Sequence, residues 1–169
     1  MHDNSITLMR AFINRYLRRD VVLKIADVGS FDVNGTYRSY FDAPGGSYTG
    51  FDIRPGNNVD VVLAGPEFWN TPPEHLEAYD VVVSGQVMEH VRRPWRWIRD
   101  VASLCRPGGL IWISAPNSDQ FHEHPIDCFR YWPDGMRAVA GEAALEELSC
   151  MQNGPDTTGV FRKPEKSVV

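Results

Sequence analysis

Two segments of the chain concentrate the side chains best suited to moving a proton. His90 follows Glu89 in one of them, and His122 and His124 lie in the other, so these segments hold three of the five histidines. Imidazole titrates near neutral pH and takes a proton from a hydroxyl when it is held within hydrogen-bond reach. We therefore expect His124 or His122 to act as a general base, with His90 as the next candidate. Asp127 is expected to orient a histidine or the substrate.

Each of these candidates also has a structural interpretation. The Glu89-His90 pair can cap the following turn and hold the neighbouring loops together. The two loop histidines can be solvated side chains, and Asp127 can form an ion pair with Arg130, three residues further on. The sequence leaves these alternatives open.

A third region carries a glycine-bearing turn and, farther along, an acidic residue. Asp27, Gly29 and Ser30 close an apolar run, and Asp52 closes the next one. A glycine at a strand end lets the backbone approach a ligand closely, and an acidic residue ending the second strand accepts hydrogen bonds from ribose hydroxyls. The next glycine after Gly29 is Gly35, so the G-x-G-x-x-G fingerprint of dinucleotide sites is absent. These features predict a nucleoside ligand without phosphates.

Apolar runs and amphipathic stretches define the elements that must position these residues. Strand-length runs without polar alternation suit a parallel sheet buried on both faces, and they cover residues 21–28, 47–53, 59–63, 80–84 and 110–115. We expect helices at residues 5–19, 34–41, 94–105 and 133–140, and a final hairpin at 145–151 and 157–162. The first helix, within residues 1–20, is expected to cover the sheet. Between residues 53 and 59 only a loop fits, because a parallel crossover usually needs about a dozen residues.

This alternation predicts the α/β class, as a Rossmann-like, doubly wound and mostly parallel sheet with a C-terminal antiparallel hairpin. The length fits a single domain, residues 1–169. The formal net charge of −5 makes nucleic acid an unsuitable partner, because phosphate contacts need clustered Lys and Arg. The three cysteines form no CxxC pair, so we predict neither a disulfide framework nor a cysteine zinc site and expect a cytoplasmic setting. We also predict no metal at the ligand-type residues His122, Glu123, His124 and Asp127, because neighbours at this spacing do not converge on one ion unless the loop folds to bring them together. The sequence contains no run of about 18 apolar residues, so we predict no membrane span.

Four motifs occur in order along the chain. They are Asp27-Val28-Gly29-Ser30 with Asn34-Gly35, then Gly50-Phe51-Asp52-Ile53, then residues 79–84 with Met88-Glu89-His90-Val91, and finally residues 104–109. Together they resemble the class I S-adenosylmethionine-dependent methyltransferases, close to the type 11 group, over roughly residues 21–115. The resemblance implies that the nucleoside is S-adenosylmethionine, which carries no phosphate, and that the product is S-adenosylhomocysteine.

The resemblance also implies roles for particular residues. The cofactor set it gives is Asp27, Gly29, Ser30, Asn34, Asp52, Ile53, Ser84, Gly85 and Gln86. Asp52 would bind the ribose with Ile53 beside the adenine, and the set after the fourth strand, Ser84 to Gln86, would line the pocket floor. Two departures from the family pattern stand out: Phe31 and Val33 occupy positions where glycines often occur, and the stretch directly after the third strand, Leu63-Ala64-Gly65-Pro66, holds no acidic residue. Backbone groups or Glu67 and Phe68 would then recognise the adenine.

The expected methyl acceptor is a hydroxyl of a sugar, a glycan or a small natural product. Residues 122–137 resemble small methyltransferases of surface-glycan and secondary-metabolite assembly, and the D/N-P-P-Y/F motif of amino-nitrogen methylation is missing after the fourth strand. This step rests on analogy. The alternative is a non-catalytic protein of the same fold that binds S-adenosylmethionine or another nucleoside, or acts as a scaffold. A homodimer is possible.

Overall fold

The computed structural model describes residues 3–166 except residues 19, 34, 43, 64 and 66–70. The expected cofactor residue Asn34 and the expected adenine neighbours Glu67 and Phe68 therefore lie outside the described residues.

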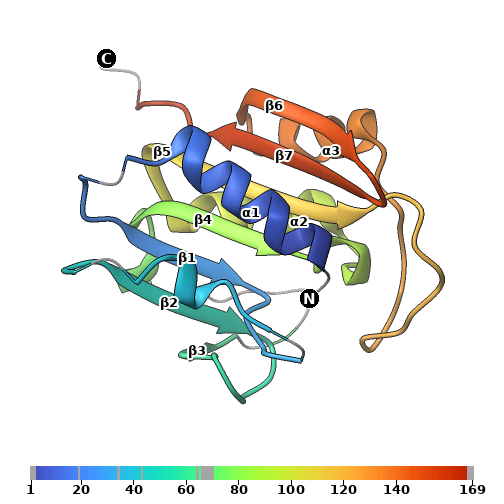
Figure 1. The fold of residues 1–169 in the computed structure, drawn as a ribbon, viewed down its shortest axis with the longest axis horizontal. Helices are drawn as coiled ribbons and strands as arrows, with labels where there is room; N and C mark the ends of the chain where they lie inside the picture. Colours follow the sequence, from blue (N-terminus) through green and yellow to red (C-terminus); the bar gives the residue numbers. More distant parts are fainter. Residues whose placement is uncertain are drawn as a thin grey trace.

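Seven strands form one sheet in the order β3-β2-β1-β4-β5-β7-β6 (Figure 1). Their bounds are β1 Lys24–Val28, β2 Ser47–Asp52, β3 Val61–Val62, β4 Tyr79–Gly85, β5 Cys105–Pro116, β6 Glu146–Asn153 and β7 Asp156–Arg162. The first five strands pair in parallel, and β7 runs antiparallel to both β5 and β6. The strand order reverses beside β1 and β4, which is where open sheets of this kind bind ligands. The predicted fold class is confirmed.

Helices cover both faces of this sheet. Helix α1 (Asp3–Tyr16) crosses one face, and α2 (Pro94–Leu104) and α3 (Pro133–Gly141) lie on the other (Figure 1). Along β1 the side chain of Ile25 packs with the α1 cluster, whereas that of Ala26 packs with the opposite cluster. Because successive strand residues alternate between two buried faces, the strand reads as a continuous apolar run.

The helix predicted at residues 34–41 is wrong. Only a 3-10 helix at Arg38–Tyr40 forms in the described part of that segment. Asp32 Oδ1 accepts a hydrogen bond from the Gly35 backbone N–H at 2.6 Å, and Gly35 has φ of +129°. This local turn satisfies the backbone in a non-helical conformation. Tyr37 then packs edge-on against Trp112, below α1.

The two ends of the sheet differ in how closely they match the expectation. The hairpin of β6 and β7 forms as predicted, with Gly154 at φ +64° in its turn. The loop between β2 and β3 also holds no helix among the described residues. Strand β5 begins earlier than expected, at Cys105, because Tyr79 pairs with it across a register shift and because Gly109 accepts a 3.0 Å hydrogen bond from Lys163 N–H.

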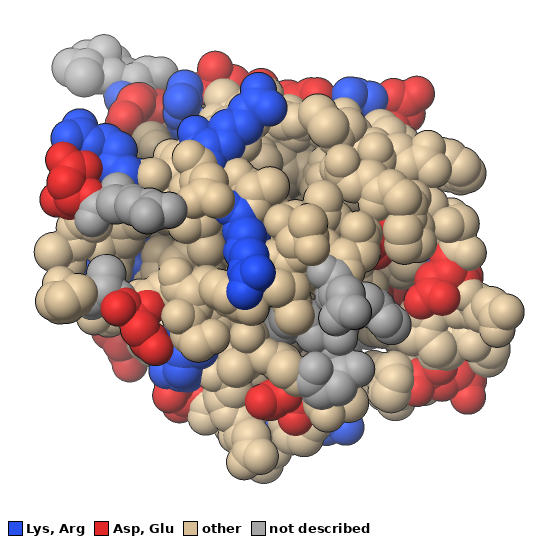
Figure 2. Space-filling view, viewed as in Figure 1, with Lys and Arg blue, Asp and Glu red and all other residues tan. Residues whose placement is uncertain are grey.

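Charged side chains are dispersed over the face that carries α1. Figure 2 shows Lys and Arg near the middle and along the edge of this face, Asp and Glu mainly around its edge, and most of the surface neutral. Among the helices of the described residues, none is long and apolar enough to cross a membrane.

Candidate active site

A cavity of about 590 Å³ opens at the carboxyl ends of the parallel strands. This volume is within the usual range for a small-molecule site, about 300–1,000 Å³. Its lining includes Asp27, Gly29, Ser30, Asp52, Ile53, Gly85 and Gln86 from the expected cofactor set, together with His90, His122 and His124. The strand ends and the 119–126 segment therefore bring the two groups of expected residues to one cavity.

The glycine turn after β1 has a conformation that only glycine accepts easily. Gly29 has φ of +83°, and a Cβ placed on it would lie 2.1 Å from Val87 Cγ2. The backbone N–H groups of Gly29 and Ser30 donate to the Phe51 carbonyl at 2.8 and 3.1 Å. Gly85 is equally tight, since a Cβ there would lie 2.3 Å from the hydroxyl of Tyr37. These two positions keep side chains out of the cavity floor.

Asp27 is an acidic group in a nearly dry part of the cavity wall. It is 4% exposed, and the hydroxyl of Tyr48 donates a short hydrogen bond to its Oδ2. Burial raises the pKa of Asp27 to about 7, against the opposing effects of the Tyr48 hydrogen bond and the Arg38 charge. A carboxyl group of this kind gains most from a ligand that brings a positive charge.

Asp52 is fixed at the end of β2 by backbone groups. Its Oδ2 accepts from Phe31 N–H and its Oδ1 from Arg54 N–H, both at 3.1 Å. Ile53 follows it on the cavity wall. The guanidinium carbon of Arg54 lies 4.4 Å from the centroid of the Phe31 ring, so these two side chains form one edge of the cavity.

Ser84 lies outside the cavity lining, which corrects the expected pocket floor. It is buried, and its hydroxyl donates to the Val28 carbonyl at 2.8 Å, so it links β4 to β1. Gln86 does line the cavity, with φ of +60°, and its Nε2 donates to Asp156 Oδ1 at 3.0 Å. Ser30 presents a buried hydroxyl that finds no hydrogen-bond partner among the described residues.

Sequence reasoning missed several lining side chains. Tyr37, Arg54 and Phe121 line the cavity, and Phe31 was noted only as a departure from the glycine pattern. They come from loops whose course depends on tertiary contacts. Tyr37, for example, is buried and shares a short hydrogen bond with the hydroxyl of Ser5 at the start of α1. The sequence carries no periodic signal for such positions.

Three imidazoles gather in the lining of the same cavity. The ring centroids of His90 and His122 are 5.1 Å apart, and that of His124 lies 5.9 Å from His90 and 6.1 Å from His122. His90 Nδ1 donates to the Ile126 carbonyl at 2.5 Å. Burial lowers the pKa of His90. The structure therefore brings together all three histidines that the sequence singled out.

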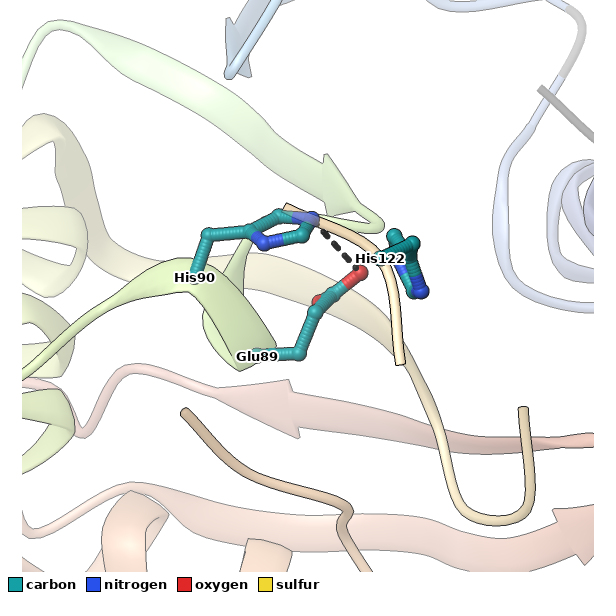
Figure 3. A group of neighbouring side chains, drawn as sticks. All are labelled: Glu89, His90 and His122. Atoms are coloured by element: carbon teal, nitrogen blue, oxygen red, sulfur yellow. Dashed lines mark ion pairs between the residues drawn. The ribbon is translucent and has the colours of Figure 1, made fainter. Parts of the chain in front are cut away.

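Glu89 lies beside the rings of His90 and His122 and is fully buried (Figure 3). Neither carboxylate oxygen has a hydrogen-bond partner among the described residues, and burial raises the pKa of Glu89 to about 8. Its backbone carbonyl accepts from Cys128 N–H at 2.8 Å and Phe129 N–H at 3.2 Å. The Glu89-His90 segment thus does hold the neighbouring loop, as the structural interpretation proposed, and it also leaves an unpaired acidic side chain beside the cavity.

Asp127 holds the backbone of His122 and forms no hydrogen bond to a histidine ring among the described residues. Its two oxygens accept from the Arg130 guanidinium at 2.5 and 2.7 Å, and Arg130 holds the pKa of Asp127 well below its usual range. The nearest ring nitrogen, His122 Nδ1, is 3.8 Å away, while the His122 backbone N–H donates to Asp127 at 2.8 Å. The ion-pair interpretation is confirmed, and Asp127 positions the loop backbone.

Comparisons with curated proteins give short matches of substantial identity. The chain is 44% identical over 41 residues to a ubiquinone biosynthesis O-methyltransferase of Parvibaculum lavamentivorans, a match that covers 24% of this chain and 16% of that protein. It is 37% identical over 65 residues to the protein of the same name in Marinobacter nauticus, covering 38% and 27%. The matches thus span less than a third of the length of these relatives.

The fold match extends over nearly the whole chain. An S-adenosylmethionine-dependent methyltransferase from Mesorhizobium loti superposes with a TM-score of 0.69 at 12% identity, covering 95% of this chain and 98% of that one. A sequence model of the family described as "Methyltransferase domain" matches residues 4–153. The resemblance seen in the four motifs is thereby confirmed, and the chain belongs to the methyltransferase domain family.

Proposed function

We propose that the protein transfers a methyl group from S-adenosylmethionine to a hydroxyl of a small molecule. The observation that carries the proposal is the cavity itself, whose lining includes both the glycine turn with Asp52 and three imidazoles. A donor bound by the first group and an acceptor bound beside the second would meet inside one enclosure, and such positioning lowers the barrier by removing the entropy cost of encounter.

The residues of the cofactor end fit this ligand in charge and in hydrogen bonding. S-adenosylmethionine supplies an electrophilic methyl carbon on a sulfonium when it is bound. The Asp27 carboxyl is suited to the ammonium group of its methionine part, and the carboxylate of Asp52 is suited to the two ribose hydroxyls. The absence of a phosphate-binding glycine loop agrees with a ligand that carries no phosphate.

At the acceptor end the protein must hold the hydroxyl in line with the methyl carbon and receive its proton. His124 is our first choice for the base, because it lines the cavity and its ring receives no hydrogen bond from the described residues. As the acceptor oxygen bonds to the methyl carbon and the carbon–sulfur bond breaks, the hydroxyl proton passes to an imidazole nitrogen. His122 is the second choice.

The acceptor class we propose is a hydroxyl of a sugar, a glycan or a small natural product. The name of the two curated relatives, O-methyltransferase, supports oxygen as the methylated atom. Phe121 is 72% exposed and lies at the cavity, where an aromatic ring offers a surface for a sugar or another flat molecule.

Calorimetry with S-adenosylhomocysteine tests the proposal. We expect binding by the wild-type protein and a loss of at least about tenfold in Asp52→Ala, since that change removes charge-assisted hydrogen bonds to ribose. Transfer of a labelled methyl group into a set of phenols and sugars then separates an enzyme from a non-catalytic cofactor-binding protein. No detectable S-adenosylhomocysteine binding would refute the proposal, and binding without transfer to any hydroxyl acceptor would favour the non-catalytic alternative.

A further inference from the structure

Arg38 lies outside the cavity lining, yet its guanidinium gathers acceptors from several segments around the cofactor residues. It begins the 3-10 helix that follows the Gly35 turn. Its Nε donates to Asn58 Oδ1 and its Nη2 to Asp60 Oδ2, both at 2.5 Å, and its Nη1 donates to the Tyr48 carbonyl at 3.2 Å. One side chain therefore joins the segment after β1 to β2 and to the loop between β2 and β3.

The Tyr48 ring connects Arg38 to the buried carboxyl group of Asp27. The guanidinium carbon of Arg38 lies 4.6 Å from the centroid of this ring, which is a cation–π contact. The hydroxyl of the same ring donates the short hydrogen bond to Asp27 Oδ2. Burial raises the pKa of Asp27, the Tyr48 hydrogen bond and the Arg38 charge oppose this rise, and the carboxylate of Asp52 adds to it. Arg38 thus acts on Asp27 through a ring that it contacts and through its charge.

The Asn58 amide connects Arg38 to the glycine turn. Because a guanidinium only donates, it fixes Oδ1 of Asn58 as the acceptor and leaves Nδ2 to donate to the Ser30 carbonyl at 2.9 Å. Asn58 has φ of +69°, a conformation that Asn adopts more readily than most residues. A Cβ on Gly50 would lie 2.0 Å from the Asn58 carbonyl oxygen and 2.5 Å from Ser30 Oγ. The loop between β2 and β3 is thereby held close against the turn after β1.

Ser30 is a residue of this turn with a polar group available to a ligand. It belongs to the cavity lining, and its buried hydroxyl has no hydrogen-bond partner among the described residues. A buried polar group without a partner is unfavourable, and a ligand that bonds to it removes that cost. The carbonyl of the same residue is the group that Asn58 holds, so the amide fixes the backbone from which the hydroxyl projects.

We propose that Arg38 is a positioning residue for cofactor binding. It holds the Asp27 carboxyl through the Tyr48 ring, and it holds the glycine turn through the Asn58 amide. This inference rests on the proposed function, in which the carboxyl and the turn contact the cofactor. A planar guanidinium can serve several acceptors and stack on a ring at the same time, which a lysine ammonium cannot do. Groups that are held in place before the ligand arrives lower the entropy cost of binding.

An ion pair with Asp60 alone would give Arg38 a structural role only. The side chains of Arg38 and Asp60 are 33% and 46% exposed, and ion pairs with this much exposure contribute little to stability. The two roles predict different results. A structural Arg38 would change the stability of the fold and leave the cofactor affinity of the folded protein unchanged, whereas a positioning Arg38 changes that affinity.

Calorimetric titration with S-adenosylhomocysteine tests the positioning role. Arg38→Gln should weaken binding by about tenfold or more, because both connections are lost. Asn58→Gly accepts the positive φ but lacks the amide, so it should weaken binding by a smaller factor, through the glycine turn alone. Arg106→Gln is the matched control, because Arg106 pairs with Asp80 at 2.7 Å at the amino end of β4, whereas the cavity opens at the carboxyl ends of the strands. The control should bind with wild-type affinity.

The pH dependence of binding is a second measurement, which a purely structural role would not change. An ionised Asp27 favours the ammonium group of the ligand, so binding tightens as Asp27 loses its proton. Arg38→Gln removes a positive charge that favours the ionised carboxyl, so this tightening should move to higher pH. Arg38→Lys keeps the charge without the planar fork, so it should bind more weakly than the wild-type protein with a similar pH dependence.

The outcomes separate the positioning role from the proposed function. Circular dichroism first establishes that each variant is folded. If the wild-type protein binds S-adenosylhomocysteine and Arg38→Gln binds it equally well, or if Arg106→Gln loses as much affinity, the positioning role is wrong and the proposed function stands. Wild-type affinity in Asn58→Gly would overturn the connection through the glycine turn. If the wild-type protein does not bind S-adenosylhomocysteine, the proposed function fails and the positioning role fails with it.

Discussion

The buried carboxyl group of Asp27 makes the stability of the free protein depend on pH. Its pKa is raised from 3.8 to about 7, chiefly by burial. Between these values the folded chain keeps a proton that the unfolded chain releases. The contribution to stability is therefore fully present below about pH 4 and is lost as the pH rises through about 7.

The magnitude follows from the two pKa values. The interval from 3.8 to about 7 corresponds to about 4 kcal/mol of proton-linked stability. Asp27→Asn keeps a neutral side chain of the same shape beside Tyr48 and does not ionise. We expect the variant to lack this pH-dependent loss, so that at pH 8 it exceeds the wild-type protein in unfolding free energy by up to about 4 kcal/mol, while near pH 4 the two are similar.

Urea unfolding of the ligand-free protein at intervals from pH 4 to 8 measures this difference. The affinity for S-adenosylhomocysteine, measured by calorimetry, should change with pH in the opposite direction, because the positive ammonium group of the ligand favours the ionised carboxyl. Binding should tighten as the pH rises through 7 in the wild-type protein, and this change should be smaller in Asp27→Asn. Parallel stability curves for the two proteins from pH 4 to 8 would refute the assignment of a neutral, buried Asp27.

Three further substitutions test particular contacts. Gly29→Ala introduces a Cβ 2.1 Å from Val87 at a positive φ, so it should lower the unfolding free energy by about 1–3 kcal/mol in urea titrations and weaken S-adenosylhomocysteine binding in calorimetry. Ser84→Ala removes the hydrogen bond to Val28 and should cost about 1 kcal/mol of stability with no change in cofactor affinity; a large loss of affinity would return Ser84 to the cofactor site. Arg130→Ala leaves the buried Asp127 carboxylate without its ion-pair partner, so thermal unfolding should show a loss of about 1–3 kcal/mol, and methyl transfer should fall more than cofactor binding.

The sheet was predictable because its strands are buried on both faces. The residues of β1 and β4 alternate between two hydrophobic clusters, so the sequence shows uninterrupted apolar runs at the right places. The glycine turn and Asp52 were equally accessible to prediction, since a strand end fixes where they must lie. The absence of an α-helix in the described part of residues 34–41 was not predictable, because the hydrogen bond from Gly35 N–H to the Asp32 side chain and the positive φ of Gly35 favour a local turn over a helix.

The acceptor end was predictable only as a list of residues. His90 follows β4 and His122 follows β5, and no sequence pattern predicts that the loop after β5 folds back over the loop after β4. The contacts that determine this use backbone groups of the loop after β5: the Glu89 carbonyl accepts from Cys128 N–H, and the Ile126 carbonyl accepts from His90 Nδ1. Any residue type can provide a backbone N–H or carbonyl, so the sequence of the loop after β5 does not reveal these pairings.

The same backbone contacts decide which imidazole is available as a base. A base needs a lone pair aimed at the acceptor hydroxyl, and the only lone pair of neutral His90, on Nε2, faces the Glu89 carboxylate at 3.5 Å. His90 is therefore paired with Glu89 and directs no lone pair at an acceptor hydroxyl. His124 has a ring without a hydrogen bond from the described residues, on the cavity wall, and so is free to turn toward a hydroxyl. The sequence analysis placed His124 or His122 ahead of His90 as the base, and we propose the same order from the direction of the His90 lone pair.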